Sequence, residues 1–250
     1  MKTKKQNPPK GGTLTKEQIK WLNECTTRTF STGTWKLNPQ TGEVDVKGDF
    51  NCSEQDLSDF KGVRFGVVER NFYCNYNQLT SLVGAPQKVG IFSCYSNRLT
   101  SLEGAPQKVW SFDCNDNRLT SLEGAPRKVR GNFYCYNNRL TSLVGAPEKV
   151  GESFFCWNNL LTSLEGAPRK VRFKGWFFCD DNPVPERTLK SIFSRMEKGE
   201  SYLKAVEYLW PKIPLEDQVL LYRPEFKWVG AEEAKKLQAV GRFNKIKGIL

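Results

Sequence analysis

The stretch FSCYSNRLTSLEGAPQKV, residues 92–109, is followed by FDCNDNRLTSLEGAPRKV, residues 112–129, and the same pattern recurs along much of the chain. A cysteine stands at the same place in each copy, and the intervals between these cysteines are 20 to 23 residues. The seven cysteines are Cys52, Cys74, Cys94, Cys114, Cys135, Cys156 and Cys179. A repeat with this fixed period is typical of a solenoid, in which each coil packs against its two neighbours.

The fixed positions of one unit, Val89, Phe92, Cys94, Asn97 and Leu99, resemble the leucine-rich repeat pattern L-x-x-L-x-L-x-x-N-x-L. The segment GAPxKV is similar to part of the shortest repeats of this family, those of bacterial effector proteins. The resemblance covers roughly residues 49–184. It implies a parallel β-solenoid with short strands on one face and extended, polyproline-like segments on the other.

The recurring cysteine is best explained as packing. Phe and Cys two positions apart on a strand point to the same side, into the core, and cysteine is among the most buried residue types. The Asn three positions later is expected to form a ladder that bonds buried backbone groups. Metal sites favour closely spaced cysteine pairs, and disulfides are unusual in a reducing compartment, so we expect no metal and no other cofactor.

One sequence, Cys179-Asp180-Asp181, resembles the catalytic motif of the leucine-rich-repeat ubiquitin ligases. Those ligases place the cysteine in a much larger separate domain, whereas Cys179 belongs to the repeat. The ligase-like hypothesis therefore stays an alternative, and the main expectation is a protein that is not an enzyme. The chain has no histidine, which excludes His-assisted nucleophiles and His general acid–base chemistry.

The ends of the chain are expected to cover the ends of the solenoid. Residues 1–12 are predicted to form a disordered basic arm, and residues 13–48 an N-terminal cap with a helix that begins at Thr15 and a following hairpin. In that helix Ile19, Leu22 and Cys25 fall at helical intervals. Residues 185–250 are predicted to be helical, either as a C-terminal cap or as a small interaction module.

The net charge of +11 is unevenly distributed. Residues 1–48 contribute +5 (9 basic minus 4 acidic), residues 49–182 contribute +2 (16 minus 14) and residues 183–250 contribute +4 (13 minus 9). A lysine also recurs in every APxKV segment, at Lys88, Lys108, Lys128, Lys149 and Lys170. The basic ends and this lysine row make nucleic-acid binding the second functional hypothesis, although glutamates in the same coils offset the row.

Neither a membrane-spanning segment nor a secretory signal is predicted, because no apolar run is long enough and the first residues are charged. A cytoplasmic location is therefore expected. The LTSLxGAPxKV repeats look like those of uncharacterised proteins encoded by phages and bacterial genomes. That resemblance implies a phage protein in the host cytoplasm, for example an inhibitor of a host defence nuclease such as an anti-CRISPR protein, acting by occlusion or conformational locking.

Positions on either side of each cysteine point outward and vary from coil to coil, so they are free to specify a partner. Large aromatic residues gather there, and a row of arginines stands four positions after three of the cysteines. The residues predicted to contact a protein partner are Tyr73, Tyr95, Tyr134, Tyr136, Phe155, Trp157, Phe178, Asp113, Asn115, Arg98, Arg118 and Arg139. The alternative is that C-terminal helices fold over Phe155 and Phe178 and bury them.

Overall fold

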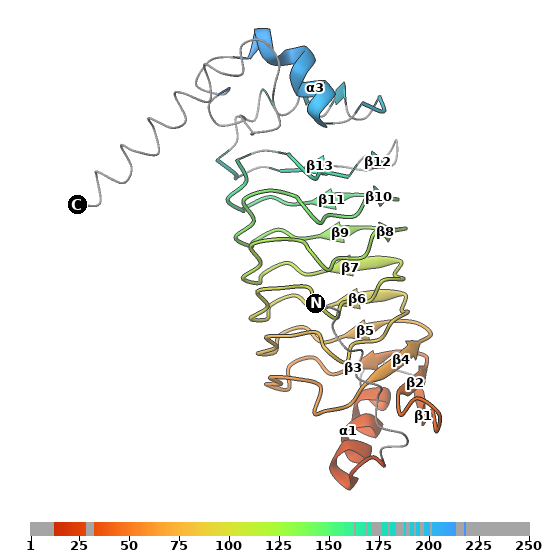
Figure 1. Cartoon of the computed structure of the whole chain (residues 1–250). Helices are drawn as coiled ribbons and strands as arrows, with labels where there is room; N and C mark the ends of the chain where they lie inside the picture. The colour runs from red at the N-terminus through yellow and green to blue at the C-terminus, as the bar shows by residue number, and fades with distance from the viewer. Residues whose placement is uncertain are drawn as a thin grey trace, which may run out of the picture.

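The computed structural model describes residues 13–28, 33–162, 164–168, 170–171, 177–179, 181–183, 188, 191–192, 194–195, 198–200, 202–213 and 218. They form a parallel β-solenoid in which the chain climbs one coil per repeat (Figure 1). The predicted fold class is confirmed. The arm over residues 1–12 and the basic segment over residues 219–250 lie outside the described residues.

The main sheet has one short strand from each repeat, and all of its strand pairs are parallel. Its seven described strands are β3 (Phe50–Asn51), β5 (Phe72–Tyr73), β6 (Ile91–Ser93), β7 (Ser111–Asp113), β9 (Phe133–Tyr134), β11 (Phe154–Phe155) and β13 (Phe177–Phe178). Each phenylalanine pairs with the one in the next coil. Rings from Phe72 to Phe154 therefore stack in the core with centroids 5.3–5.6 Å apart.

An asparagine ladder holds the turn after each strand, as the repeat predicts. The Nδ2 of Asn97 donates to the carbonyl oxygens of Cys94 in its own coil (3.0 Å) and Cys74 in the preceding coil (3.0 Å). Its Oδ1 accepts the backbone N–H of Leu79 at 2.9 Å. The corresponding contacts are made by Asn77, Asn117, Asn138, Asn159 and Asn182. One side chain thus joins two coils and satisfies buried backbone groups.

The column cysteines from Cys52 to Cys156 are fully buried, with no exposed surface. Several thiols donate to a backbone carbonyl of the next coil, for example Cys94 Sγ to Asp113 O at 3.3 Å and Cys114 Sγ to Tyr134 O at 3.3 Å. Burial raises the pKa of the Cys94 and Cys114 thiols well above the ordinary value. The packing role predicted for these cysteines is confirmed.

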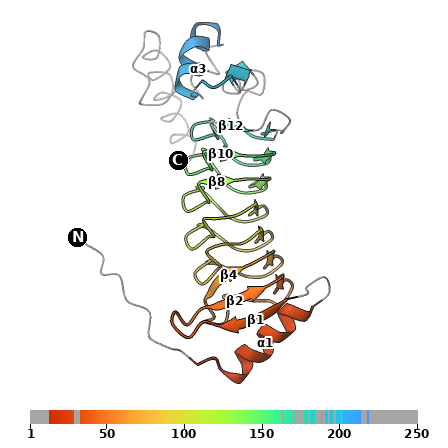
Figure 2. The same ribbon diagram turned by 90° about the vertical axis from the view of Figure 1, so that its right-hand side faces the viewer.

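A second sheet lies on the back face. It has β8 (Lys128–Val129), β10 (Lys149–Val150) and β12 (Lys170–Val171) in parallel, and Figure 2 shows them above β4 (Phe65–Val68). Single bridges Val67↔Lys88, Lys88↔Lys108 and Val109↔Val129 extend the same column through the intervening coils. In the KV pairs up to Lys149–Val150 the valines point inward and are buried, whereas the lysines are exposed.

At the N-terminal end, helix α1 (Lys16–Thr27) follows Thr15, where its start was predicted, and Thr15 and Gln18 form a capping box there. Leu22 and Cys25 are buried as expected. The expectation for Ile19 is wrong, because this side chain is 39% exposed and Trp21 is buried in its stead. Trp21 packs edge-on against Phe50 (5.4 Å between ring centroids), and its Nε1 donates to Gln55 Oε1 at 2.7 Å.

The predicted hairpin is formed by β1 (Thr34–Leu37) and β2 (Val44–Lys47), which pair in antiparallel fashion. β2 also pairs in parallel with β4, so the hairpin continues the back sheet. At the C-terminal end, helix α3 (Tyr202–Leu209) and the 3-10 turn η1 (Trp210–Lys212) lie beyond β13 (Figure 1). Val206 and Trp210 are buried and belong to the same hydrophobic cluster as the coils.

Candidate functional site

The outward face of the main sheet has two columns of variable residues, one on each side of the cysteines. In the first column the parallel register places Tyr73, Ser93, Asp113, Tyr134, Phe155 and Phe178 in successive coils. The second column runs through Asn75, Tyr95, Asn115, Tyr136 and Trp157. Because parallel strands lie about 4.8 Å apart, neighbours in a column are within contact distance of one another.

Five of the predicted aromatic residues form one continuous surface, which we call the aromatic stack: Tyr134, Tyr136, Phe155, Trp157 and Phe178. In the first column the ring of Phe155 lies parallel to that of Tyr134 (4.8 Å, 8°) and to that of Phe178 (5.1 Å, 8°). In the second column Tyr136 and Trp157 stack at 4.3 Å and 9°. Tyr134 meets Tyr136 edge-on at 6.5 Å, which joins the two columns.

Stacking leaves every ring of this surface half-buried. The alternative of a helical cover would require Phe155 and Phe178 to be fully buried, and they are only half-buried. Each ring is held by its neighbours along the solenoid, so the side chains are ordered before any partner arrives. A preordered aromatic surface loses little conformational entropy on binding, which is an advantage for an interface.

The tyrosine hydroxyls of this face are neutral hydrogen-bonding groups. Partial burial raises the pKa of Tyr134 and Tyr136, and the carboxylate of Asp113 nearby raises both further. Partial burial also raises the pKa of Tyr95, and its neighbour Tyr76 raises it further. These hydroxyls therefore remain protonated and available to donate across the physiological range.

A polar centre interrupts the aromatic residues. Burial raises the pKa of Asp113 to about 7, and the nearby carboxylate of Asp116 adds to the effect. Asp113 Oδ1 accepts the backbone N–H of Asn115 at 3.3 Å. Asn115, which we expected on the open face, is only 3% exposed, because the larger Tyr95 and Tyr136 occupy the adjacent coils of its column. Asn115 is thus too deep to be a main contact residue.

Residues that our sequence interpretation missed lie two positions after the cysteines, where the backbone is left-handed. Tyr76 is 53% exposed and meets Tyr95 edge-on at 4.9 Å. Further along, Asn137 Nδ2 donates to Asp116 Oδ1 (2.7 Å) and Asn158 Nδ2 donates to Asn137 Oδ1 (2.8 Å). Repeated Asn and Asp at this position was the available signal, because these residues tolerate positive φ.

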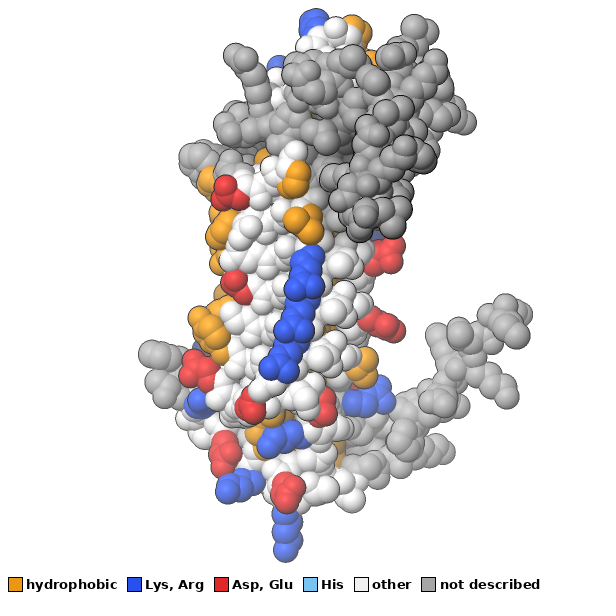
Figure 3. All heavy atoms as spheres, turned by 90° about the vertical axis from the view of Figure 1, so that its left-hand side faces the viewer, with side chains coloured by type: hydrophobic (Ala, Val, Ile, Leu, Met, Phe, Trp, Pro, Cys, Tyr) orange, Lys and Arg blue, Asp and Glu red, His pale blue; other side chains and the backbone are white. Residues whose placement is uncertain are grey.

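The predicted arginine row is exposed along the turn edge. The backbone N–H groups of Arg98, Arg118 and Arg139 bond to leucine carbonyls of the preceding coils, so the three residues fall in one column. Figure 3 shows a continuous row of basic side chains on this side of the solenoid. Within the described part of the chain these three arginines take part in no ion pair, so their guanidinium groups are available to an acidic or aromatic partner group.

The described residues of this face line two shallow hollows. One, of about 290 Å³, is lined by Phe155, Trp157, Phe178 and Asp181 at the C-terminal end of the aromatic stack. The other, of about 500 Å³, joins the arginine row to the turns and is lined by Glu54, Asp56, Tyr76, Asn77, Gln78, Ser96 and Arg98. The sequence-predicted set therefore divides into an aromatic stack, a polar centre and an arginine edge, with Tyr73 separated from the stack by Ser93 and Asp113.

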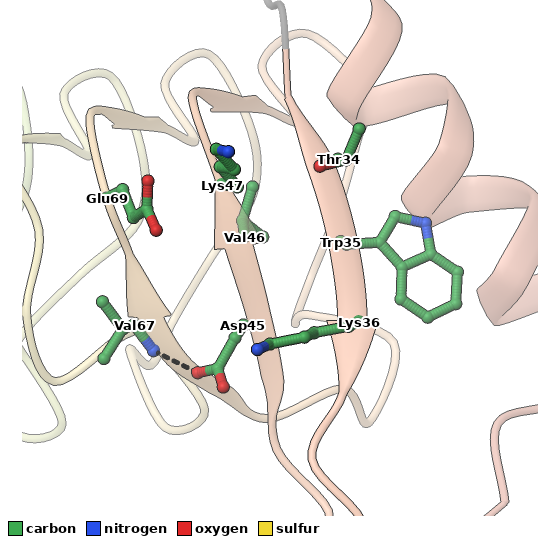
Figure 4. Close-up of a pocket in the computed structure, with 8 residues that line it drawn as sticks. All are labelled: Thr34, Trp35, Lys36, Asp45, Val46, Lys47, Val67 and Glu69. Carbon is green, nitrogen blue, oxygen red and sulfur yellow. Dashed lines mark hydrogen bonds between the residues drawn. The ribbon is translucent and has the colours of Figure 1, made fainter.

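A third hollow, of about 300 Å³, lies at the N-terminal hairpin and is drawn in Figure 4. Asp45 on β2 accepts the backbone N–H of Val67 on β4 at 2.9 Å, where the register of the two strands shifts. The carboxylate fits over Gly66, where a Cβ would clash with it. Asp45 therefore joins the hairpin to the first coil at this irregular junction. We explain the hollow by the shift in strand register and assign it no binding role.

Cys179 stands in the cysteine column and is only partly buried. Asn182 Nδ2 donates to its carbonyl oxygen at 2.8 Å, as at every other rung of the ladder. Asp180 of the C-x-D sequence lies outside the described residues. Among the residues that the structure describes, no group of three or more His, Cys, Asp or Glu side chains is placed to hold a metal ion. The same part of the chain contains no helix long and apolar enough to cross a membrane.

No protein-family model matches the chain, and no curated protein sequence matches it either. The fold and the geometry of the outward face therefore define the class of the molecule: a parallel β-solenoid with an ordered aromatic surface.

Proposed function

We propose that this chain is a non-enzymatic scaffold, built from short leucine-rich repeats, whose outward face binds a protein partner. The observation that supports this most directly is the aromatic stack. Five large rings stand together on a surface that the solenoid does not need for its own core. Tyrosine, tryptophan and arginine are the residues that most often dominate the energy of protein interfaces.

The surroundings of the stack also suit a protein partner. Arginines without ion pairs among the described residues lie along the turn edge, and the carboxyl groups of Asp113 and Asp116 and the neutral hydroxyls of Tyr134 and Tyr136 belong to the same face. A surface with apolar rings, both signs of charge and hydrogen-bond donors matches the mixed composition of a protein surface better than it matches a uniform polyanion.

Binding rather than catalysis is favoured by the chemistry of the candidate nucleophiles. The column thiols have raised pKa values because of burial, and only the thiolate is nucleophilic. The chain supplies no histidine as a base. A scaffold of this kind would act by covering a functional surface of its partner or by holding it in one conformation, which is also what the hypothesis of a phage-encoded inhibitor of host defence requires.

The test replaces the rings and asks which surface a partner touches. A photo-crosslinking residue is placed at Asn158, beside Trp157, or at Val83, which is 68% exposed in the Gly-Ala-Pro turns. The chain is incubated with a host-cell extract, the crosslinked protein is identified and purified, and its Kd is measured by calorimetry. We expect crosslinks from position 158 and none from position 83.

The affinity for the purified partner should fall at least about 100-fold in Tyr134→Ala/Tyr136→Ala/Trp157→Ala, the loss expected for removal of interface hot spots. Asn158→Lys keeps every ring and adds an exposed charge beside Trp157, so it should also weaken binding. This variant tests the same surface if the triple variant does not fold. Val83→Ala/Val144→Ala is the matched control for exposed apolar surface elsewhere. Unchanged affinity in both face variants would refute the proposed surface.

A further inference from the structure

The back face of the solenoid has its own ordered column of charge, independent of the outward face. Lys88, Lys108, Lys128 and Lys149 stand in successive coils of one parallel ladder, to which β8 and β10 in Figure 2 belong, and the valines that follow them are buried. All four lysines are exposed. Adjacent strands are about 4.8 Å apart, so like charges are held close together along the whole ladder.

The charge of this column is not balanced locally. Within the described residues, Lys88, Lys108, Lys128, Lys149 and the nearby Arg130 take part in no ion pair. The contrast with Arg127 is direct, since Arg127 on the same face pairs with Glu148 at 2.6 Å. A row of unpaired cations repels itself and concentrates counterions, so an anionic polymer that displaces those counterions would bind with a gain in entropy.

A groove of about 480 Å³ follows part of this ladder; we call it the lysine groove. Its charged lining residues are Lys88, Lys108, Lys128 and Arg130 against one acid, Glu69, which leaves a net charge of +3 (four minus one). Its floor is formed by Val68, Val89, Gly90 and Val109. The groove also holds one large aromatic side chain, Trp110, which is 51% exposed.

Trp110 is seated between two glycines. Its backbone N–H donates to Gly90 O at 2.7 Å, and its carbonyl accepts the N–H of Gly131 at 2.7 Å. A Cβ at Gly131 would lie only 2.7 Å from Nε1 of Trp110, so the glycine leaves room for the indole. Trp110 directly follows the KV pair of its coil, and in two other coils this position is glycine, at Gly90 and Gly151. The fold therefore does not need tryptophan at this position.

We propose that the lysine groove binds single-stranded nucleic acid, with phosphates along Lys88, Lys108 and Lys128 and a base against the indole of Trp110. A basic track that follows the backbone beside an exposed aromatic ring is the common arrangement for single strands. A paired base is covered on both faces within a duplex and cannot stack on a side chain. An acidic peptide would use the lysines but gains nothing comparable from the ring.

The experiment measures fluorescence anisotropy of labelled single-stranded DNA and RNA oligonucleotides with the full chain over a series of salt concentrations. A duplex of the same sequence and a polyglutamate of similar length serve as competitors. We expect the single strand to bind most tightly, with affinity that falls steeply with salt.

Lys88→Gln/Lys108→Gln/Lys128→Gln should weaken binding at low salt and reduce the magnitude of the log–log salt slope by about 2, since each phosphate contact to a single strand contributes ~0.7. Trp110→Gly, which introduces the residue that stands at Gly90 and Gly151, should weaken single-strand binding by about five-fold or more with the salt slope unchanged, because stacking is not a charge effect. Both variants change only exposed side chains, and circular dichroism checks that each one folds.

The control Arg98→Gln/Arg118→Gln/Arg139→Gln removes the same charge from the turn edge and should leave the affinity within about two-fold. Equal losses in the lysine and arginine variants would mean that net charge alone is responsible, and would overturn the site. So would unchanged binding by Trp110→Gly, equal competition by duplex or polyglutamate, or no binding at low salt. The proposed protein partner lies on the other face and is unaffected by any of these outcomes.

Discussion

Removal of one rung of the asparagine ladder tests whether these side chains hold the coils together. In Asn117→Ala four buried hydrogen bonds are lost: those from Nδ2 to the carbonyls of Cys94 (3.1 Å), Cys114 (3.2 Å) and Asn115 (3.1 Å), and that from Leu99 N–H to Oδ1 (2.9 Å). Their individual costs are unequal, because most of the partners have a second bond.

The carbonyl of Cys94 keeps the amide of Asn97, that of Cys114 keeps the amide of Asn138, and that of Asn115 keeps the N–H of Ser96. Leu99 N–H is the group left without its ladder partner. A buried donor without a partner costs ~1–3 kcal/mol, and the other lost bonds add a smaller amount, so we expect a total of about 2–4 kcal/mol.

The isosteric change Asn117→Asp separates hydrogen bonding from packing. It places a carboxylate oxygen where Nδ2 faced three carbonyl oxygens, so the ionised form is disfavoured and the folded state raises the pKa of the new carboxyl above its unfolded value. Stability is then greatest at low pH and is lost as pH rises above about 4. At pH 7 Asn117→Asp should be less stable than Asn117→Ala, and the difference should shrink towards pH 4.

Urea unfolding followed by circular dichroism gives the free energy of unfolding, and amide hydrogen exchange locates the change. Exchange at Leu99 should accelerate, whereas Leu119, whose N–H is held by Asn138, should stay protected. Gln87→Ala, at an exposed amide two coils before that of Asn117, is the control. If Asn117→Ala costs no more than this control and Leu99 stays protected, the ladder does not stabilise the solenoid.

Three further predictions concern the outward face, the cysteine column and the coil spacing. The pKa of Asp113 is raised from 3.8 to about 7, so the native state binds this proton more tightly than the unfolded state does. The free energy of unfolding should therefore fall as pH rises from about 4 to about 7, by at most about 4 kcal/mol. A series of denaturation curves for Asp113→Asn over the same pH range should lack that slope. An identical slope in the variant would show that Asp113 is not the group that titrates. Thiol labelling of the native protein should be slow at Cys74, Cys94 and Cys114, because burial raises the pKa of each thiol, and it should be fast after denaturation. Mass spectrometry measures the labelling rate of each cysteine. A native rate equal to the rate in urea at any of the three would show that the column is open to solvent. Gly151→Ala should lower the melting temperature clearly, because its Cβ would lie 2.6 Å from the carbonyl carbon of Arg130 in the preceding coil. The control Gly199→Ala meets nothing within 4 Å and bears only the strain of a φ of +95°. Equal shifts of the melting temperature in the two variants would argue against close coil contact at Gly151.

The constant positions of the repeat could be predicted because they follow from the period alone. Phe92, Cys94, Asn97 and Leu99 have counterparts in the neighbouring coils, and a parallel stack brings equivalent positions into contact whatever the details of each turn. The inward direction of the phenylalanine and cysteine, and the bonding of the asparagine to two coils, needed only the alternation of a strand and the need to satisfy buried backbone groups.

The variable positions were harder, because exposure there depends on the sizes of neighbours in other coils. Asn115 is buried because Tyr95 and Tyr136 flank it, which no single repeat reveals. Ile19 is exposed and Trp21 is buried, where Gln55, at the ladder position of the first coil, accepts the Trp21 indole N–H. The same Gln55 replaces the usual asparagine, so the first rung faces the N-terminal helix and does not continue the ladder.

The contrast between constant and variable positions explains how one repeat can present two different surfaces. Core residues are constrained by both neighbouring coils, so changes there are felt along the stack. The positions beside the cysteine accept rings at Tyr134 and Phe155. The position after the KV pair accepts an indole at Trp110, whereas at Gly90 and Gly151 the backbone of the preceding coil leaves no room for a Cβ. Large aromatic side chains at positions where the fold tolerates serine or glycine are costly to expose, and this supports selection for binding on both faces.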